Sequence, residues 1–312
     1  MEQFVQQIIN GLSYGAIYAL IAVGYTMVYG VLRLINFAHG DIYMVGAMVG
    51  LYAAGWFRLM PRPGEEPNPS WLGFFIVLIA AMVICGVLGF LIERLAYRPL
   101  RNQPRITALI TAIGISMLLE SGGQKLFGAT PQAFPQLVPG IEKSPAMFTV
   151  AGAMVSKVDV IIFTTTLVLM LALRYIVQHT KTGMALRAVS FRFDTAALMG
   201  ININRIISFT FVLGSALAAA AGVLVAVKYP KVDPLMGLIP GIKAFIAAVL
   251  GGIGNIYGAV AGGLLLGLTE VLVAGYLPHG SQYRDGVAFV ILIAVLLVKP
   301  SGLFGKHGIE KV

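Results

Sequence analysis

Apolar residues follow one another in long runs without charge along this chain. Four runs are long: residues 3–32, 67–92, 206–227 and 244–269. Four others are shorter: residues 42–57, 106–119, 160–173 and 286–298. A membrane-crossing helix needs roughly 18 or more apolar residues, so the shorter runs cross only with flanking residues that snorkel or as broken helices inside a bundle. The pattern predicts an all-α polytopic transmembrane bundle of about eight to ten segments, some discontinuous, in a single domain over residues 1–312.

The last long run is interrupted by the stretch GGIGNIYG, residues 251–258. Clustered Gly and Asn are typical of a turn, so we expect a helix break at this point. The sequence GDIYMVGAMVG at 40–50 is similar to GNIYGAVAGG at 254–263. This similarity suggests a possible internal repeat of helix groups, as transporters often contain, without deciding whether the halves are inverted.

The composition excludes a soluble protein. Hydrophobic residues make up 58% of the 312 residues and charged residues only 11%, against about 25% charged in a soluble domain. The single Cys85 forms no internal disulfide, and packing explains it best. The first apolar run lacks the basic segment of a secretory signal, so we expect it to remain as a helix. We expect no catalytic residues, metal ligands or bound cofactor in this chain.

Basic residues gather in three regions and explain the net charge of +9. They are Arg94, Arg98, Arg101 and Arg105; Arg174, Lys181, Arg187, Arg192 and Arg205; and Lys299, Lys306 and Lys311. Such clusters mark cytoplasmic segments of a membrane protein rather than a nucleic-acid site. We therefore predict a cytoplasmic loop at 178–205, a periplasmic loop at 125–158, a cytoplasmic C-terminus and a periplasmic N-terminus.

Three polar residues stand between two apolar runs in LINFAHGDIYMVGA, residues 34–47. Asn36, His39 and Asp41 are costly to expose to lipid, so each should face a cavity or a partner. Two compatible hypotheses remain open. The residues cap a helix break at Gly40, with Asp41 accepting hydrogen bonds from free N–H groups, or they line a pathway in which broken helix ends contact a solute.

Other polar residues are candidates for the same pathway. Thr107 and Thr111, followed by Ser116, can present hydroxyls along one helix, although such hydroxyls usually bond to their own helix. Glu120 and Glu270 end apolar runs, and both can simply mark the outer interface. Glu270 is retained as a pathway candidate because it follows a Gly-rich helix suited to a cavity wall.

Within the second basic region, residues 184–198 combine apolar and charged positions at helical spacing. Leu186, Val189, Phe193 and Ala197 fall three to four residues apart. They predict a short amphipathic helix outside the bilayer, ended by Gly200. Such a helix either lies on anionic lipid or inserts into the groove of a cytoplasmic partner.

The motif DTAALMG, residues 194–200, resembles the E-A-A-x-x-x-G signature of bacterial ABC importer permeases, with Asp194 in place of Glu and Thr195 in place of the first Ala. Three longer blocks extend the resemblance over essentially the whole chain: NGLSYGAIYALIAVGYTMVYGVLRLINFAHGDIYMVGA, ERLAYRPLRNQPRITALITAIGIS and AFIAAVLGGIGNIYGAVAGGLLLGLTE. These blocks resemble the branched-chain amino acid permeases, in particular the LivH-type subunit.

The resemblance implies the permease subunit of an ATP-driven importer for leucine, isoleucine or valine in a bacterial inner membrane. It implies a second, LivM-like permease subunit, a periplasmic binding protein, and two cytoplasmic ATPase subunits that hold ATP and Mg²⁺. The segment that couples to the ATPases would contain Arg187, Arg192, Asp194, Ala196, Ala197 and Gly200. No complete Walker A loop occurs: PSGLFGKH, residues 300–307, lacks the first Gly and the final Ser or Thr.

Three alternatives remain. An ion-coupled secondary transporter would use Asp41, Glu120 or Glu270 as its ion site. An ABC permease of the same kind could carry urea or short amides instead. A membrane-embedded enzyme ranks last, because no nucleophile, metal ligands or acid–base pair cluster in the sequence.

Overall fold

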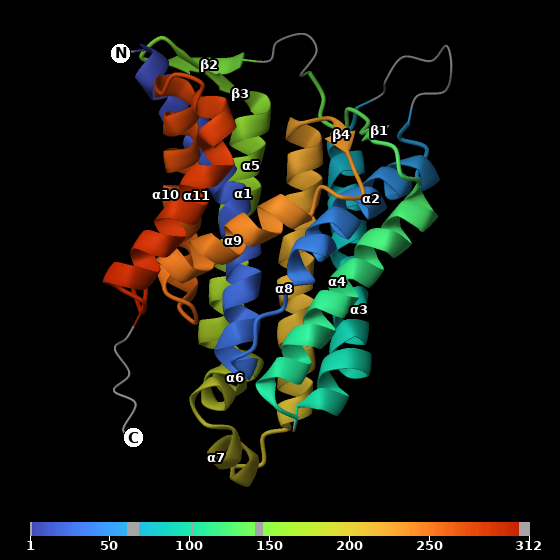
Figure 1. The fold of residues 1–312 in the computed structure, drawn as a ribbon. Helices are drawn as coiled ribbons and strands as arrows, with labels where there is room; N and C mark the ends of the chain where they lie inside the picture. Colours follow the sequence, from blue (N-terminus) through green and yellow to red (C-terminus); the bar gives the residue numbers. More distant parts are fainter. Residues whose placement is uncertain (1, 61–68, 102, 141–145, 306–312) are drawn as a thin grey trace.

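A computed structural model describes residues 2–60, 69–101, 103–140 and 146–305. In these residues the chain is a helical bundle with two small sheets at one end (Figure 1). The helices are α1 (Glu2–Leu32), α2 (His39–Trp56), α3 (Trp71–Ile92), η1 (Glu93–Tyr97), η2 (Arg98–Leu100), α4 (Arg105–Phe127), α5 (Lys157–His179), α6 (Lys181–Phe191), α7 (Phe193–Leu198), α8 (Ile203–Lys228), α9 (Leu238–Gly251), α10 (Ile256–Tyr276) and α11 (Gly280–Val298). The strands are β1 (Gln132–Ala133), β2 (Ala146–Val150), β3 (Ala153–Ser156) and β4 (Lys231–Val232).

Seven helices in the described residues are long and apolar enough to cross a membrane. The shorter α2 and α9 lie among them, which confirms a polytopic all-α bundle with discontinuous segments. The predicted break in the last long run is also confirmed. Helix α9 ends at Gly251, α10 begins at Ile256, and Gly252 and Gly254 between them have positive φ angles of 102° and 95°.

The helices form two groups of four, α1–α4 and α8–α11, that run in opposite directions (Figure 1). Helix α1 runs from the N-terminal end of the bundle to the end that carries α6 and α7, whereas α8 runs the other way. Helix α1 packs along α10, and α3 packs along α8. Helices α1 and α8 are therefore antiparallel, as are α2 and α9. The similar stretches at 40–50 and 254–263 lie in α2 and around the start of α10, which are the second member of one group and the third member of the other.

The short helices α2 and α9 both begin near the centre of the bundle and run toward opposite ends (Figure 1). Their first turns touch through backbone atoms. A Cβ added to Gly40 would lie 2.7 Å from the carbonyl oxygen of Gly237 and 2.7 Å from the Cα atom of Gly241. Only glycine permits this approach, which brings two helix N-termini together inside the bundle.

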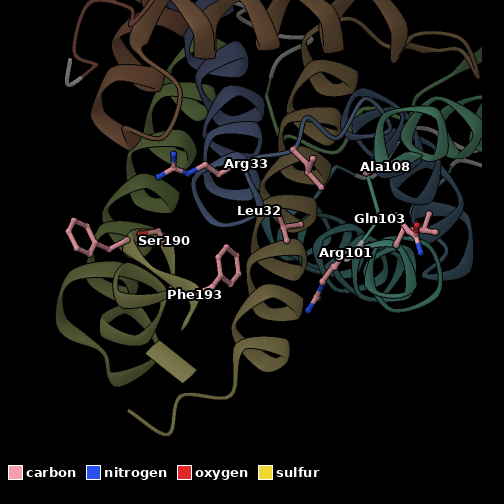
Figure 2. Close-up of a pocket in the computed structure, with 10 residues that line it drawn as sticks. Leu32, Arg33, Arg101, Gln103, Ala108, Ser190 and Phe193 are labelled. Atoms are coloured by element: carbon pink, nitrogen blue, oxygen red, sulfur yellow. The ribbon is translucent and has the colours of Figure 1, made fainter. Parts of the chain in front are cut away.

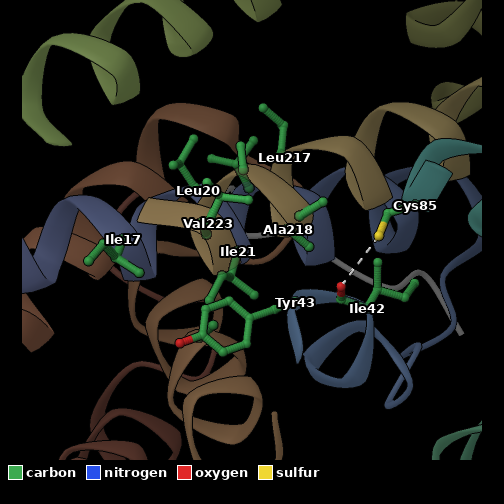
Figure 3. Packing of buried hydrophobic residues seen from close by; sticks show 14 of the residues in the cluster. Ile17, Leu20, Ile21, Ile42, Tyr43, Cys85, Leu217, Ala218 and Val223 are labelled. Carbon is green, nitrogen blue, oxygen red and sulfur yellow. Dashed lines mark hydrogen bonds between the residues drawn. The ribbon is translucent and has the colours of Figure 1, made fainter. Parts of the chain in front are cut away.

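The core consists of small and branched residues from α1, α2, α3 and α8 (Figure 3). Leu20 and Ile21 of α1 are fully buried, and Gly46 of α2 packs directly on Ala219 of α8. Cys85 is free and buried, with its Sγ atom 3.9 Å from the carbonyl oxygen of Ile42. Packing therefore explains this cysteine, as predicted.

Candidate functional site

The polar residues singled out around Gly40 lie at the start of α2, where α2 approaches α9. Asn36 is 2% exposed, and its Oδ1 atom accepts a hydrogen bond of 2.9 Å from the hydroxyl of Tyr97. His39 is the first residue of α2, and its ring meets that of Tyr25 edge to face at 4.7 Å. The His39 Nε2 atom is buried and has no hydrogen-bond partner within the described part of the chain.

Asp41 joins α2 to α4. Its Oδ2 atom accepts a hydrogen bond of 2.5 Å from the hydroxyl of Ser116. The N-cap residue of α2 is Ala38, and no side chain caps the helix from that position. A helix break is present, but it lies at residues 33–38, and Gly40 falls inside α2 where it permits the contact with α9. The Asp41 carboxylate engages the neighbouring helix.

Of the three hydroxyl residues singled out on α4 from the sequence, only Ser116 reaches this cluster. The Thr111 hydroxyl donates to the Thr107 carbonyl at 2.8 Å, the intrahelical bond that such residues usually form. Thr107 and Thr111 lie in the first turns of α4, at the end of the bundle that also carries α6. The structure does not bring them to Asp41.

Glu270 occupies a second, separate cluster. It is fully buried, and its two oxygens lie 2.8 Å from Lys243 Nζ and 3.0 Å from Arg284 Nε. The Tyr18 hydroxyl donates to Glu270 Oε2 at 3.1 Å. Lys243 also contacts Asp285 Oδ1 at 2.6 Å. Two carboxylates and two cations therefore hold α9, α10 and α11 together, because each buried charge has a partner.

Sequence reasoning did not identify Lys243. This lysine is 4% exposed, although its position at the edge of an apolar run predicts the boundary of a membrane segment. A lone lysine inside IPGIKAFIAAV, residues 239–249, is the pattern that could have identified it, since an intramembrane charge needs a partner. Tyr18 and Tyr25 contact the two clusters and lie seven residues apart on α1, roughly 10 Å along the helix.

The segment predicted as one amphipathic helix forms two helices, so that prediction was wrong. Helix α6 ends at Phe191 and α7 begins at Phe193, because Arg192 between them is extended (φ −152°, ψ 120°). The break changes the helical phase. Leu186 and Val189 are buried as expected, but Ala196 is buried in place of Ala197.

Gly200 ends α7 as predicted. Its φ angle is +79°, its N–H bonds to the Ala197 carbonyl, and the Ile201 N–H bonds to the Ala196 carbonyl. This pair of bonds is a Schellman motif, which requires a left-handed residue at the position of Gly200. Arg192 and Asp194 are exposed close by.

The outer surface of the α6–α7 pair carries apolar side chains that nothing in the described chain covers. Phe191 is 81% exposed, Leu198 is 88% exposed and Met199 is 79% exposed. The pair protrudes beyond the rest of the bundle (Figure 1). Exposed apolar residues at a protein tip are typical of a surface for protein interaction. Phe191 also lines the cavities beside α6.

A cavity of about 350 Å³ lies behind this tip, between the end of α1, the segment after η2, and α6 with α7. Figure 2 shows Arg33, Arg101, Ser190 and Phe193 around it. The Arg101 guanidinium pairs with buried Glu93 and donates to Asn204 Oδ1 at 2.6 Å. Together with a 2.5 Å bond from Ser208 to Glu93, these contacts connect the end of α3 to the start of α8.

Comparisons with known proteins identify the family. The family described as "Branched-chain amino acid transport system / permease component" matches residues 7–296. The high-affinity branched-chain amino acid transport system permease protein LivH of Salmonella typhimurium is 43% identical, over 99% of this chain and 98% of its own length. BraD of Pseudomonas aeruginosa, which has the same description, is 42% identical over the same shares. The chain belongs to the family of branched-chain amino acid transport permeases.

Proposed function

We propose that this chain is the permease subunit of an ATP-driven ABC importer for leucine, isoleucine and valine in a bacterial inner membrane. The observation that carries the proposal is the similarity to LivH and BraD over 99% of the chain. The α6–α7 end, where the basic residues concentrate, lies in the cytoplasm, and the N-terminus lies in the periplasm. This orientation follows the positive-inside rule.

The exposed tip of Phe191, Leu198 and Met199 supports a cytoplasmic ATPase partner. These side chains suit insertion into a groove of a partner protein. ATP and Mg²⁺ would be held by two such ATPase subunits, and this chain would not hydrolyse ATP. The Gly200 turn joins the tip to the start of α8, so that movement of the tip reaches the bundle, and the exposed Arg192 and Asp194 are available to the partner.

The face formed by α4 and α11 supports a second permease subunit, related to this chain as LivM is to LivH. Only 17% of the apolar window of α4 and 6% of that of α11 are buried. Both helices also flank the short helices α2 and α9, and the Asp41 carboxylate accepts a hydrogen bond from Ser116 of α4. A pathway between two subunits would pass this face, with Asn36, His39 and Asp41 behind it. A periplasmic binding protein would deliver the amino acid.

The test is reconstitution of this chain in proteoliposomes with a partner permease, two ATPase subunits and a leucine-binding protein. We expect leucine, isoleucine and valine to stimulate ATP hydrolysis and to be taken up only with ATP. Stimulation by urea or short amides alone would reassign the substrate. Uptake by the isolated chain under a proton or sodium gradient would instead establish an ion-coupled transporter.

A further inference from the structure

A second cavity, of about 1060 Å³, lies between α1, α5, α6 and α10 and is unrelated to the clusters around Asp41 and Glu270. Its volume is at the upper limit of the roughly 300–1,000 Å³ of small-molecule sites. Leu171 and Tyr257, which line it, are each more than half exposed. The cavity is therefore a groove that opens sideways between α5 and α10.

The groove carries positive charge at one end. Arg33 follows the end of α1, and Arg174 lies near the end of α5. Arg187, which the resemblance placed in the coupling segment, lies on α6 and lines the groove. No Asp or Glu lines the groove, and none of these three arginines forms an ion pair with another described residue. All three side chains are exposed. Three guanidinium groups without a counter-charge give this end of the groove a positive potential that attracts an anion.

Hydrogen bonds hold this basic end in place. Gln178 accepts from Arg174 Nε at 3.4 Å, and its carbonyl oxygen accepts from Arg187 Nη2 at 3.4 Å. The Gln178 amide donates to the Tyr257 hydroxyl at 2.5 Å. Gln178 thus fixes two of the arginines against α10. Figure 2 shows the Arg33 guanidinium directed away from Arg101, toward the side where Ser190 lies.

The opposite end of the groove is apolar. Met170 and Leu171 lie one turn of α5 above Arg174, and Leu264 lies seven residues beyond Tyr257 on α10, roughly 10 Å deeper by helix rise. Thr26 lines the groove at this depth, and its buried hydroxyl has no hydrogen-bond partner among the described residues. Along its length the groove therefore has a cationic end, then the Thr26 hydroxyl, and then an apolar end.

We propose that this groove binds one anionic phospholipid. Its phosphate lies among Arg33, Arg174 and Arg187, and its acyl chains lie along α5 and α10. An ester carbonyl oxygen, which follows the phosphate toward the chains, accepts from the Thr26 hydroxyl. Basic pockets between transmembrane helices at the cytoplasmic interface bind lipid headgroups by the same chemistry. The inference depends on the membrane placement of the bundle and not on the transported solute.

The first experiment is a lipid titration of the purified, delipidated full chain by native mass spectrometry. The ligands are palmitoyl-oleoyl phosphatidylglycerol, palmitoyl-oleoyl phosphatidylcholine and inorganic phosphate. The groove variant is Arg174→Gln with Arg187→Gln. The matched control is Arg98→Gln with Arg205→Gln, which removes two exposed arginines outside the groove at the same end of the bundle.

We expect the groove variant to lose phosphatidylglycerol affinity about 25-fold, roughly fivefold per guanidinium, and the control to change less than about twofold. An equal loss in both variants would show general attraction of anionic lipid and overturn the proposal. Phosphatidylcholine binding as tight as phosphatidylglycerol would show an apolar groove without headgroup recognition. Displacement of the lipid by equimolar phosphate would show a small-anion site.

The second experiment uses the wild-type chain, so it does not depend on the folding of a variant. Phosphatidylglycerol with a diazirine on one acyl chain is photo-crosslinked in membranes of the assembled importer. We expect labelled peptides from 170–171 of α5 and 260–264 of α10. Labelling spread over other lipid-facing helices would overturn the proposal. Loss of the label on addition of leucine would also overturn it, because the groove would then belong to the transport pathway.

Discussion

The contact between the first turns of α2 and α9 makes a sharp prediction for Gly40→Ala. The new Cβ would lie 2.7 Å from two backbone atoms of α9, whereas ordinary contact begins at 3.4 Å. The two helices must therefore separate by about 0.7 Å. Overpacking of this kind costs about 1–3 kcal/mol, which exceeds the roughly 0.5–1 kcal/mol that Ala gains over Gly in a helix. We expect a net loss of about 1–2 kcal/mol.

The matched control is Gly114→Ala in α4, where an added Cβ has no atom within 4 Å. We expect this variant to be as stable as the wild type or more stable, by up to about 1 kcal/mol. Unfolding in mixed detergent–SDS micelles, followed by circular dichroism, gives both free energies. Uptake by proteoliposomes should fall in Gly40→Ala. Equal stability of the two variants would refute backbone contact between α2 and α9.

Three further variants test the coupling tip and the buried ion pairs. Gly200→Ala places a side chain at φ +79° with nothing within 4 Å, so the backbone gains about 1–2 kcal/mol of strain. We expect substrate-stimulated ATP hydrolysis to fall while the bundle still assembles, with Gly122→Ala as the control. Normal coupling would contradict the role of this turn. Leu198→Gln should weaken co-purification of an ATPase about tenfold, and undiminished co-purification would exclude the tip as the contact. Glu270→Gln leaves Arg284 without its carboxylate and should lower the free energy of unfolding by about 3–5 kcal/mol in the same assay. The double variant with Arg284→Met should recover part of this loss. Additive losses from the two substitutions would show that the pair does not interact.

The sequence predicts those parts of the fold that depend on local composition. Long apolar runs identify the membrane helices, because a helix of a soluble protein does not carry a run of that length without charged residues. The clustered glycines at 251–258 identify the break between α9 and α10, because Gly252 and Gly254 adopt positive φ. The left-handed end of α7 at Gly200 is predictable for the same reason. In each case the information lies within a few residues.

Features that depend on distant contacts could not be predicted. Nothing near Lys243 indicates that Glu270 and Asp285 will surround it, so the lysine resembles a segment boundary. The periodicity at 184–198 fits one helix, and nothing in it indicates that Arg192 is extended. The hypotheses about Asn36, His39 and Asp41 identify a real helix break, but the partner of Asp41 is Ser116, which lies 75 residues away in the chain.

The packing suggests how movement of the tip would reach the centre of the bundle. Helix α8 begins directly after the Gly200 turn, and Arg101, Glu93 and Ser208 tie its start to the end of α3. Helices α3 and α8 are packed along their length, as are α1 and α10, and closely packed helices move as rigid bodies. The short helices α2 and α9 pack mainly on different long helices, since α2 packs on α8 and α9 packs on α10, while α1 contacts both α8 and α10. Relative movement of α8 and α10 must then act on the glycine contact between α2 and α9, which has no side chains to absorb it. We therefore expect the bundle to be most sensitive to added volume at that contact.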